Sequence, residues 1–289
     1  MSNTIELAKS FVPKLDECYR LASLTSVLDG APELAKQGAN ANELIIPMMS
    51  MDGLADYSRN GGYVQGGVTM TNETVKCNFD RGRRFDVDVM DDLETAGLAF
   101  GRLSAQFIRD KVVPELDAFR FASYCGISGV TKKEETLADG AATVAALSAA
   151  VTAMDDEEVT ATGRYLFITP TLLQGINDMD TTKSKKVLEG FEQVIKVPQR
   201  RFYTAIKQLS GKTGEEAGGY KKATGAANIN FAIVQKDALI QYTKHAAPKI
   251  IAPENNPDAD AYVFGYRMVG IAKAYKNMLS GMYFSHDKA

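Results

Sequence analysis

The clearest pattern of apolar and polar positions lies between residues 90 and 125, where apolar side chains recur at spacings of three and four. That spacing places them on one face of a helix. Asp91 and Asp92 precede the first of them, at the end where the helix macrodipole favours negative charge. Pro114 interrupts the pattern, so the helix either bends there or ends and a second one begins. We expect a long spine that packs on a sheet through Leu93, Phe100, Leu103 and Phe107.

Strand patterns occupy the segment before this helix. An apolar run extends from Leu44 to Met49, and apolar and polar residues then alternate from Val75 to Phe79 and from Phe85 to Val89. A period of two indicates half-buried strands. The glycine-rich stretch from Ser58 to Gly67 contains Asn60-Gly61, which is a strong hairpin signal. We predict a long two-stranded excursion that leans on a neighbour, because an isolated hairpin is only marginally stable.

The second half of the chain alternates between strand and helix patterns, which is typical of an α/β arrangement. An alanine-rich helix is predicted at residues 139–154, and the acidic stretch from Asp155 to Glu158 after it is interpreted as a solvated turn. Further elements are predicted in this order: strand 164–169, helix 171–179, strands 194–197, 202–206 and 229–233, helix 237–245, and strands 262–275 and 282–284. Residues 211–225 are expected to form an exposed loop and residues 252–261 a turn.

Residues 1–43 are polar and mixed in character. An amphipathic stretch from Phe11 to Leu28 predicts a helix, with Pro13 near its start and Gly30 just after its end. Nothing in this segment could form a core of its own. We therefore expect an arm that packs on another part of the molecule or on another molecule.

Composition excludes several classes of protein. The chain has 289 residues, of which 45% are hydrophobic and 24% charged, as in ordinary globular proteins. The formal net charge of −3 lacks the basic excess of nucleic-acid-binding domains. No apolar run approaches the roughly 20 residues that span a bilayer, and the N-terminus lacks the pattern of a signal peptide, so we expect no membrane partner. Cys18, Cys77 and Cys125 are expected to be reduced thiols.

Residues that bind metals or act in catalysis are scarce, with 2 histidines and 3 cysteines. Ser210 to Thr213 resembles the end of a phosphate-binding loop, but Ile206 stands where that motif requires glycine. The four aspartates between residues 86 and 92 are as dense as those of a calcium loop, yet the glycine of such a loop is missing. We predict no catalytic, cofactor-binding or metal site, and a protein that is not an enzyme.

The order of these segments resembles the major capsid proteins of tailed bacteriophages, which have the Hong Kong 97 fold. The resemblance lies in an ordered set of stretches that together span nearly the whole chain. They are FVPKLDECYRLASLT from Phe11, DDLETAG and DKVVPELDAFRFASYC between Asp91 and Cys125, LFITPTLLQGI from Leu166, and IIAPENNPDADAYVFGYRMVGIAKAYKNMLSGMYFSH from Ile250.

The resemblance implies an α+β fold of four parts. These are an N-terminal arm (1–43), an extended β-hairpin loop (44–89), a peripheral domain with the spine helix (90–139 and 262–289) and an axial α/β domain (140–261). It implies self-assembly as pentamers and hexamers, by way of a procapsid, into the icosahedral capsid of a virion. Assembly would take place in the cytoplasm of a bacterial host, and the shell would contact packaged double-stranded DNA without sequence specificity.

Further partners implied by the family are scaffolding, portal and decoration proteins. Some relatives carry a long N-terminal scaffolding segment that a protease removes. Here the arm begins by residue 11, which leaves no room for such a segment, so we expect that either a separate scaffolding protein exists or the numbering starts after removal. The initial Met1 favours a separate scaffolding protein or none.

A shell protein functions through the surfaces at which it contacts neighbouring subunits. We hypothesise that the tip of the extended loop, or the arginine-rich strand at its base, pairs with charged groups of a neighbouring copy. Pairing of the same charges within one chain is the alternative. Exposed ion pairs contribute only about 0–1 kcal/mol each, so repetition must supply the strength. The candidate residues are Arg59, Asn60, Gly61, Gly62, Tyr63, Arg81, Arg83, Arg84, Asp86, Asp88, Asp91 and Asp92.

Two other functions remain open. An encapsulin-type bacterial nanocompartment would use the same architecture around an enzyme cargo, and nothing in the sequence excludes it. A cytosolic α/β enzyme built on residues 140–261 is the second alternative. The absence of a convergent set of His, Cys or carboxylate residues argues against it.

Overall fold

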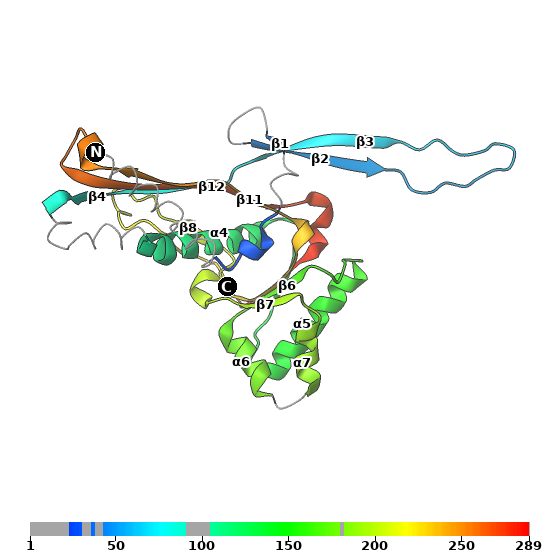
Figure 1. The fold of residues 1–289 in the computed structure, drawn as a ribbon. Coiled ribbons are helices and arrows are strands. Elements are labelled where there is room, and N and C mark those ends of the chain that lie inside the picture. Colours follow the sequence, from blue (N-terminus) through cyan, green and yellow to red (C-terminus); the bar gives the residue numbers. More distant parts are fainter. Residues whose placement is uncertain (1–22, 31–35, 38–42, 91–104, 180–181, 289) are drawn as a thin grey trace.

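The computed structural model describes residues 23–30, 36–37, 43–90, 105–179 and 182–288. Figure 1 shows a body in which helices pack on two larger sheets, and one long hairpin that projects away from that body. Helices and strands are both abundant, so the described chain is a mixed α and β structure.

The hairpin consists of β2 (Glu43–Met51) and β3 (Val68–Lys76), which pair antiparallel along their whole length. The short strand β1 (Lys36–Gln37) pairs with the root of β2. At the far end, Ser58 forms a bridge to Gly62, whose φ of +72° is a conformation that glycine adopts without strain. The turn predicted from Asn60-Gly61 therefore lies at the tip of the hairpin.

A long three-stranded antiparallel sheet lies at the root of the hairpin, in the order β11 (Leu239–Ile251), β12 (Ala261–Ala274) and β4 (Phe79–Asp88). Two predictions were wrong here. The alternating run from Phe85 to Val89 is not part of the two-stranded excursion, because β4 pairs with β12. The helix predicted at 237–245 is mostly β11, because pairing with β12 along the strand outweighs the local helical spacing.

The second large sheet is mixed and has five strands. Its order is β5 (Thr131–Glu134), β13 (Met282–His286), β10 (Ile229–Gln235), β6 (Arg164–Ile168) and β7 (Gln193–Lys196). The last strand of the chain, β13, returns to a sheet begun much earlier. Every residue of β10 and β6 is buried, because helices cover both faces of the sheet.

Three helices cover one face of the five-stranded sheet: α5 (Gly140–Asp156), α6 (Pro170–Asp178) and α7 (Thr182–Glu189). The first two were predicted from sequence to within a residue or two. Asp139 caps α5 by accepting a hydrogen bond from the backbone amide of Ala142 at 2.7 Å, which satisfies one of the free amides at the helix start.

The spine packs on both large sheets. Residues 105–107 are helical, Ile108–Val112 form a wider π-helical segment η3, and α4 (Val113–Gly126) follows directly. Pro114 therefore neither ends the helix nor starts a separate one. The wider turn stands immediately before it, where a proline would remove an amide donor from a regular helix.

The two halves of this helix serve different cores. Leu116 and the residues before it pack on the long sheet, and Phe121 and the residues after it pack on the five-stranded sheet. Phe107 lies edge-on to Phe85 of β4 with ring centroids 4.8 Å apart. Leu93, Phe100 and Leu103, the other residues predicted to pack here, lie outside the described residues, as do Asp91 and Asp92.

Short elements complete the body. They are η1 (Ser26–Leu28), η4 (Gln199–Arg201), β8 (Ile206–Gln208), β9 (Tyr220–Lys222), η5 (Lys236–Ala238), η6 (Pro253–Asn255) and η7 (Lys276–Gly281). The strand predicted at 202–206 begins only at its last residue, and the expected loop at 211–225 contains β9, which pairs with β8. The helix predicted from Phe11 to Leu28 lies mostly outside the described residues, and its last three form η1.

Candidate functional site

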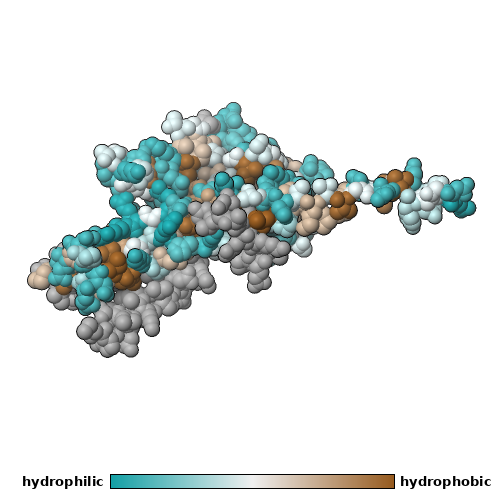
Figure 2. Space-filling view, turned by 90° about the horizontal axis from the view of Figure 1, so that it is seen from above, coloured by the Kyte–Doolittle hydropathy of each residue, from teal (hydrophilic) through white to brown (hydrophobic). Residues whose placement is uncertain are grey.

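The outer half of the hairpin exposes apolar side chains on one face. Met49 pairs with Met70 and Met51 pairs with Val68, so these four side chains project from the same face of the ribbon. Their exposed fractions are 57%, 68%, 68% and 69% for Met49, Met70, Met51 and Val68. We call these four residues the apolar face. Figure 2 shows hydrophobic side chains along the projecting hairpin.

The connection beyond the apolar face is also rich in exposed apolar groups. Leu54, Tyr57, Tyr63 and Val64 are all largely exposed, and the rings of Tyr57 and Tyr63 lie 4.9 Å apart. Eight of the ten large apolar side chains that the described residues expose most strongly lie between positions 49 and 70. Exposed apolar surface is therefore concentrated on the element that lies farthest from the core.

The root of the hairpin presents its other face to the body. Ile46 and Val75 are buried against Ile240 of β11 and Ile271 of β12. These two side chains belong to the face opposite the apolar face, because residues along a strand alternate in direction. The hairpin is thus anchored by one face at its root, while the opposite face of its outer half contacts no other part of the described chain.

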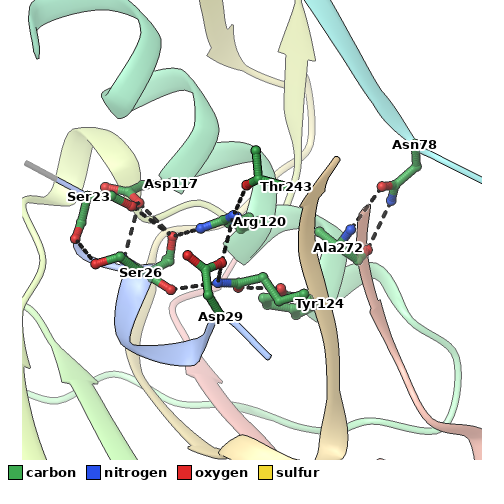
Figure 3. A network of polar contacts seen from close by, with 11 residues as sticks. Ser23, Ser26, Asp29, Asn78, Asp117, Arg120, Tyr124, Thr243 and Ala272 are labelled. Atoms are coloured by element: carbon green, nitrogen blue, oxygen red, sulfur yellow. Dashed lines mark hydrogen bonds and ion pairs between the residues drawn. The ribbon is translucent and has the colours of Figure 1, made fainter. Parts of the chain in front are cut away.

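A side-chain amide also fixes the direction of the hairpin. Asn78 lies between β3 and β4, donates through Nδ2 to the carbonyl of Ala272 at 2.9 Å and accepts from the amide of Ala272 at 3.0 Å (Figure 3). The chain leaves the hairpin at this point and enters the long sheet.

The predicted tip residues are at the far end of the hairpin. Arg59, Asn60, Gly61 and Tyr63 are exposed, and the amide of Gly61 donates to Oγ of Ser58 at 3.1 Å. Arg59 makes no hydrogen bond or ion pair with any described residue. Its guanidinium is therefore available to a neighbouring molecule.

A buried polar network attaches residues 23–29 to the spine (Figure 3). Asp117 of α4 is fully buried, and its carboxylate accepts from Oγ of Ser23 at 3.0 Å and from Oγ1 of Thr25 at 2.7 Å. The backbone amides of Leu24 and Thr25 donate to the same carboxylate. Arg201 of η4 forms an ion pair with it at 3.2 Å. These contacts satisfy a carboxylate that would be costly to bury alone.

Arg120 lies one turn further along α4 and also contacts residues 23–29, including Asp29 at the end of that segment. Its guanidinium donates to Oγ1 of Thr25 at 2.8 Å and forms an ion pair with Asp29 at 3.1 Å. It also reaches Oγ1 of Thr243 on β11 at 3.3 Å. The side chain of Arg120 is 2% exposed, so these partners replace the water that it loses.

Gln241 of β11 closes the network. Its Nε2 donates to the carbonyl of Thr25 at 2.6 Å and to Asp29 at 2.8 Å, and its Oε1 accepts from the hydroxyl of Tyr124 at 2.6 Å. Burial raises the pKa of Tyr124 far above its ordinary value, so the phenol stays protonated and donates. The network joins residues 23–29, the spine and the long sheet at one point.

The arginines of β4 make contacts within the chain. Arg81 forms an ion pair with Glu115 at 2.9 Å and donates to the carbonyl of Leu209 at 2.7 Å. Arg83 donates to the carbonyl of Glu216 at 2.8 Å. The two arginines therefore hold the glycine-rich loop between β8 and β9 against β4. The sequence left two alternatives for these charges, pairing with a neighbouring copy and pairing within one chain, and these contacts are of the second kind.

The charges farther along β4 are more exposed. Arg84 forms an ion pair with Asp86 at 2.8 Å, and this raises the pKa of Arg84. Asp88 accepts from the amide of Met90 at 2.9 Å. These residues lie at the end of the long sheet that is farthest from the hairpin (Figure 1).

A cleft of about 1070 Å³ lies between β4, the first turns of the spine and the loop between β8 and β9. We call it the cationic cleft, because its lining contains eight Lys and Arg residues and two acidic residues. Phe85, Phe107 and Tyr266 contribute apolar surface to it. The overall charge of the chain is −3, so the positive charge of this cleft is a local feature that the composition concealed.

Little in the described residues resembles a reaction centre. No group of three or more His, Cys, Asp or Glu side chains among them is placed to hold a metal ion. Burial raises the pKa of the Cys125 thiol to about 11, so it is protonated at neutral pH and is a poor nucleophile. Among the helices of the described chain, none combines the length and apolar character needed to cross a bilayer.

Sequence reasoning missed the apolar face and the residues around Asp117. Met48, Met49 and Met51 precede the glycine-rich tip in the sequence. Three methionines beside a turn could have indicated an exposed apolar surface that binds a partner. Asp117 and Arg120 interrupted the apolar pattern of a helix that is otherwise buried, which is a signal of paired buried charges.

No protein-family model matches the chain, and no curated protein matches it in sequence. Solved structures do match. The capsid of the cyanophage P-SCSP1u is 12% identical with a TM-score of 0.54, and the match covers 87% of this chain and 85% of that one. The capsid of Myoviridae phage XM1 is 9% identical with a TM-score of 0.53 and 86% of each chain covered.

A third solved structure is the virus-like particle from Pyrococcus furiosus. It is 10% identical with a TM-score of 0.59, and the match covers 96% of this chain and 98% of that one. The chain therefore has the fold of phage capsid proteins, along nearly its whole length.

Proposed function

We propose that this chain is the major capsid protein of a tailed phage or prophage, which assembles as pentamers and hexamers into an icosahedral shell around double-stranded DNA. The likeness to solved phage capsids over more than four fifths of the chain supports the proposal. Such a protein acts through the free energy of the contacts between its subunits. Each contact can be modest, because a closed lattice repeats it in every copy.

The observation that carries the proposal is the apolar face of the hairpin. Folded monomers rarely expose large contiguous apolar patches, and those that do use them to bind partners. The outer half of the hairpin reaches away from the rest of the described chain, so we expect another molecule to cover Met49, Met51, Val68 and Met70. In a closed shell every copy has a neighbour to do so, and no copy is left with the face in water.

We assign the parts of the chain to the Hong Kong 97 architecture. Residues 1–43 form the arm and 44–89 the extended loop, whose last strand, β4, pairs with β12 in the long sheet of the body. Residues 90–139 with 262–289 form the peripheral domain, and 140–261 the axial domain. Two strands join the last two parts: β11 pairs with β12 of the peripheral domain, and β13 enters the five-stranded sheet. The network around Asp117 would hold the arm at the junction of these parts.

The shell would assemble in the cytoplasm of a bacterial host and become the capsid of the virion. Its partners would be further copies of this chain, the packaged DNA, and separate scaffolding, portal and decoration proteins. We keep Arg59 at the tip of the hairpin as a candidate contact to a neighbour, because no described residue pairs with it.

The proposal is tested by expressing the chain alone and examining it by negative-stain electron microscopy and gel filtration. Closed shells are expected. A matched variant replaces residues 52–67 with Asn-Gly, which joins Met51 to Val68 by a two-residue turn and leaves their pairing intact. This variant should fold and should assemble only at higher concentrations, because it keeps the apolar face but loses the exposed apolar groups of the tip. Elution of the unaltered chain as a small oligomer at all concentrations would contradict the proposal and favour an enzyme.

The likeness to the virus-like particle from Pyrococcus furiosus favours a second candidate, an encapsulin-type nanocompartment. The two candidates differ in what the shell contains. Nuclease-protected DNA inside particles isolated from the native host would support the capsid. A stoichiometric cargo protein without DNA would support the nanocompartment.

A further inference from the structure

Several cations of the cationic cleft form no ion pair within the part of the chain that the structure describes. Lys111 at the start of the spine, Arg200 on η4 and Lys221 on β9 are all exposed and line the cleft. None of these three side chains makes a hydrogen bond or an ion pair with any described residue. Arg83 beside them contacts only a backbone carbonyl. Like charges gathered in one concave site repel each other, and an anionic occupant would relieve that repulsion.

The apolar part of the lining restricts what that occupant can be. Phe85, Phe107 and Tyr266 lie in the same cleft, between the helix and the loop. The volume of about 1070 Å³ is at the upper end of the range for ligand pockets, so a short turn of polypeptide can enter it. A concave site with aromatic walls suits carboxylates carried on such a turn better than the continuous backbone of a nucleic-acid duplex.

The chain itself carries such a turn at the end of α5. Asp155, Asp156, Glu157 and Glu158 follow one another and are all exposed. Arg164, whose side chain is 2% exposed, forms an ion pair with Asp155 at 2.7 Å and donates to the carbonyl of Thr160 at 2.9 Å. Arg164 therefore fixes both ends of this turn, and Asp156, Glu157 and Glu158 between them are exposed to solvent. We call these three residues the acidic turn.

The cleft and the acidic turn lie on opposite flanks of the body. Gly140 at the start of α5 lies against Gly175 of α6, and the helix then runs to the flank from which the hairpin projects (Figure 1). The cleft lies on the other flank, beside β8 and the first turns of the spine. Two different patches on opposite flanks are what a head-to-tail ring requires, because each subunit then offers one patch to each neighbour.

We propose that the cationic cleft of one copy receives the acidic turn of the next copy around the ring. The proposal rests on the proposed function, and it names a contact by which the subunits of a pentamer or hexamer recognise one another. The hairpin projects from the same flank as the acidic turn, so a single neighbour covers the apolar face and brings its cleft to the turn. The apolar face supplies contact energy, and the charges set the partner and the register.

The test is a charge swap between the two patches. A cleft variant carries Lys111→Glu, Arg200→Glu and Lys221→Glu. A turn variant carries Asp156→Lys, Glu157→Lys and Glu158→Lys. Each should fold with unchanged circular dichroism and melting temperature, and each should lose closed shells in negative-stain images at concentrations where the unaltered chain assembles completely. A chain with all six substitutions should form shells again, because the charges are reversed on both sides.

A matched control reverses three exposed lysines outside the cleft, Lys186, Lys196 and Lys249, and should assemble like the unaltered chain. Shells from both reversed variants would overturn the pairing and leave the proposed function intact. So would a six-fold variant that folds but forms no shells. A cleft variant that assembles normally and retains less nuclease-protected DNA would overturn the pairing and assign the cleft to nucleic acid. Absence of shells from the unaltered chain would instead count against the proposed function.

Discussion

Replacing half of the apolar face should weaken assembly by about two orders of magnitude without affecting the fold of the subunit. Met51 and Val68 form one cross-strand pair and are 68% and 69% exposed. Burial of a complete Met or Val side chain stabilises by about 1.5–3 kcal/mol, so covering the exposed two thirds contributes about 1–2 kcal/mol each. The double variant Met51→Ser, Val68→Ser therefore loses about 3 kcal/mol per contact, which corresponds to about a hundredfold in affinity.

The assay is light scattering over a dilution series, with electron microscopy of the products. The concentration at which shells appear should rise about a hundredfold in the double variant. The control is Ser50→Ala with Thr69→Ala, because these two residues pair on the opposite face of the same hairpin and are also exposed. Unchanged assembly of Met51→Ser, Val68→Ser, or equal loss in the control, would refute the assignment of a docking face.

Three further predictions concern the body of the subunit. Asp117→Ala should lower the free energy of unfolding of the unassembled subunit by about 3–5 kcal/mol in urea titrations, because it leaves a buried charge network without its acceptor; a loss below about 1 kcal/mol would contradict this. Folding raises the pKa of Cys125 to about 11, so the folded state keeps a proton that the unfolded state loses, and stability should fall as pH rises from about 9 to 11. Cys125→Ala should make that fall shallower, and an identical slope in urea titrations across this range would count against burial of the thiol. Gly140→Ala should lower the melting temperature by several degrees, because its Cβ would overlap the carbonyl oxygen of Gly175, whereas Gly53→Ala meets nothing within 4 Å and should have no effect.

Local patterns in the sequence correctly predicted those elements whose tertiary contacts favour the same secondary structure. The helix at 139–154 has a capping aspartate and an uninterrupted alanine-rich run, and α5 forms there. Leu166 and its neighbours form a short apolar run bounded by proline, and β6 forms there. The helix prediction for 237–245 was wrong because the spacing of this segment suits a helix, while its actual partner is β12. Leu239 pairs with Ala274 and His245 with Val269, far beyond the reach of local patterns. No local signal records that pairing.

The candidate site was only partly predictable for the same reason. The glycine-rich tip was found because turn residues act locally, through backbone conformations that glycine permits. The apolar face was not found, because exposure is a property of the folded hairpin and its distance from the body. The cationic cleft was also missed, because its lysines and arginines come from four elements, β4, the spine, η4 and β9, that are distributed along the chain between Arg81 and Lys222.

The sequence by itself determined many of the elements, the turn at the tip of the hairpin, the scarcity of residues for catalysis and a resemblance to capsid proteins. These follow from periodicity, composition and turn chemistry, which act over a few residues. Only the tertiary structure decided that β4 belongs to the body, that Asp117 and Arg120 hold residues 23–29, and that opposite charges face opposite flanks. Those outcomes depend on which distant segments of the chain come into contact. Burial and the pairing of charges contribute to the free energy only after that contact has formed.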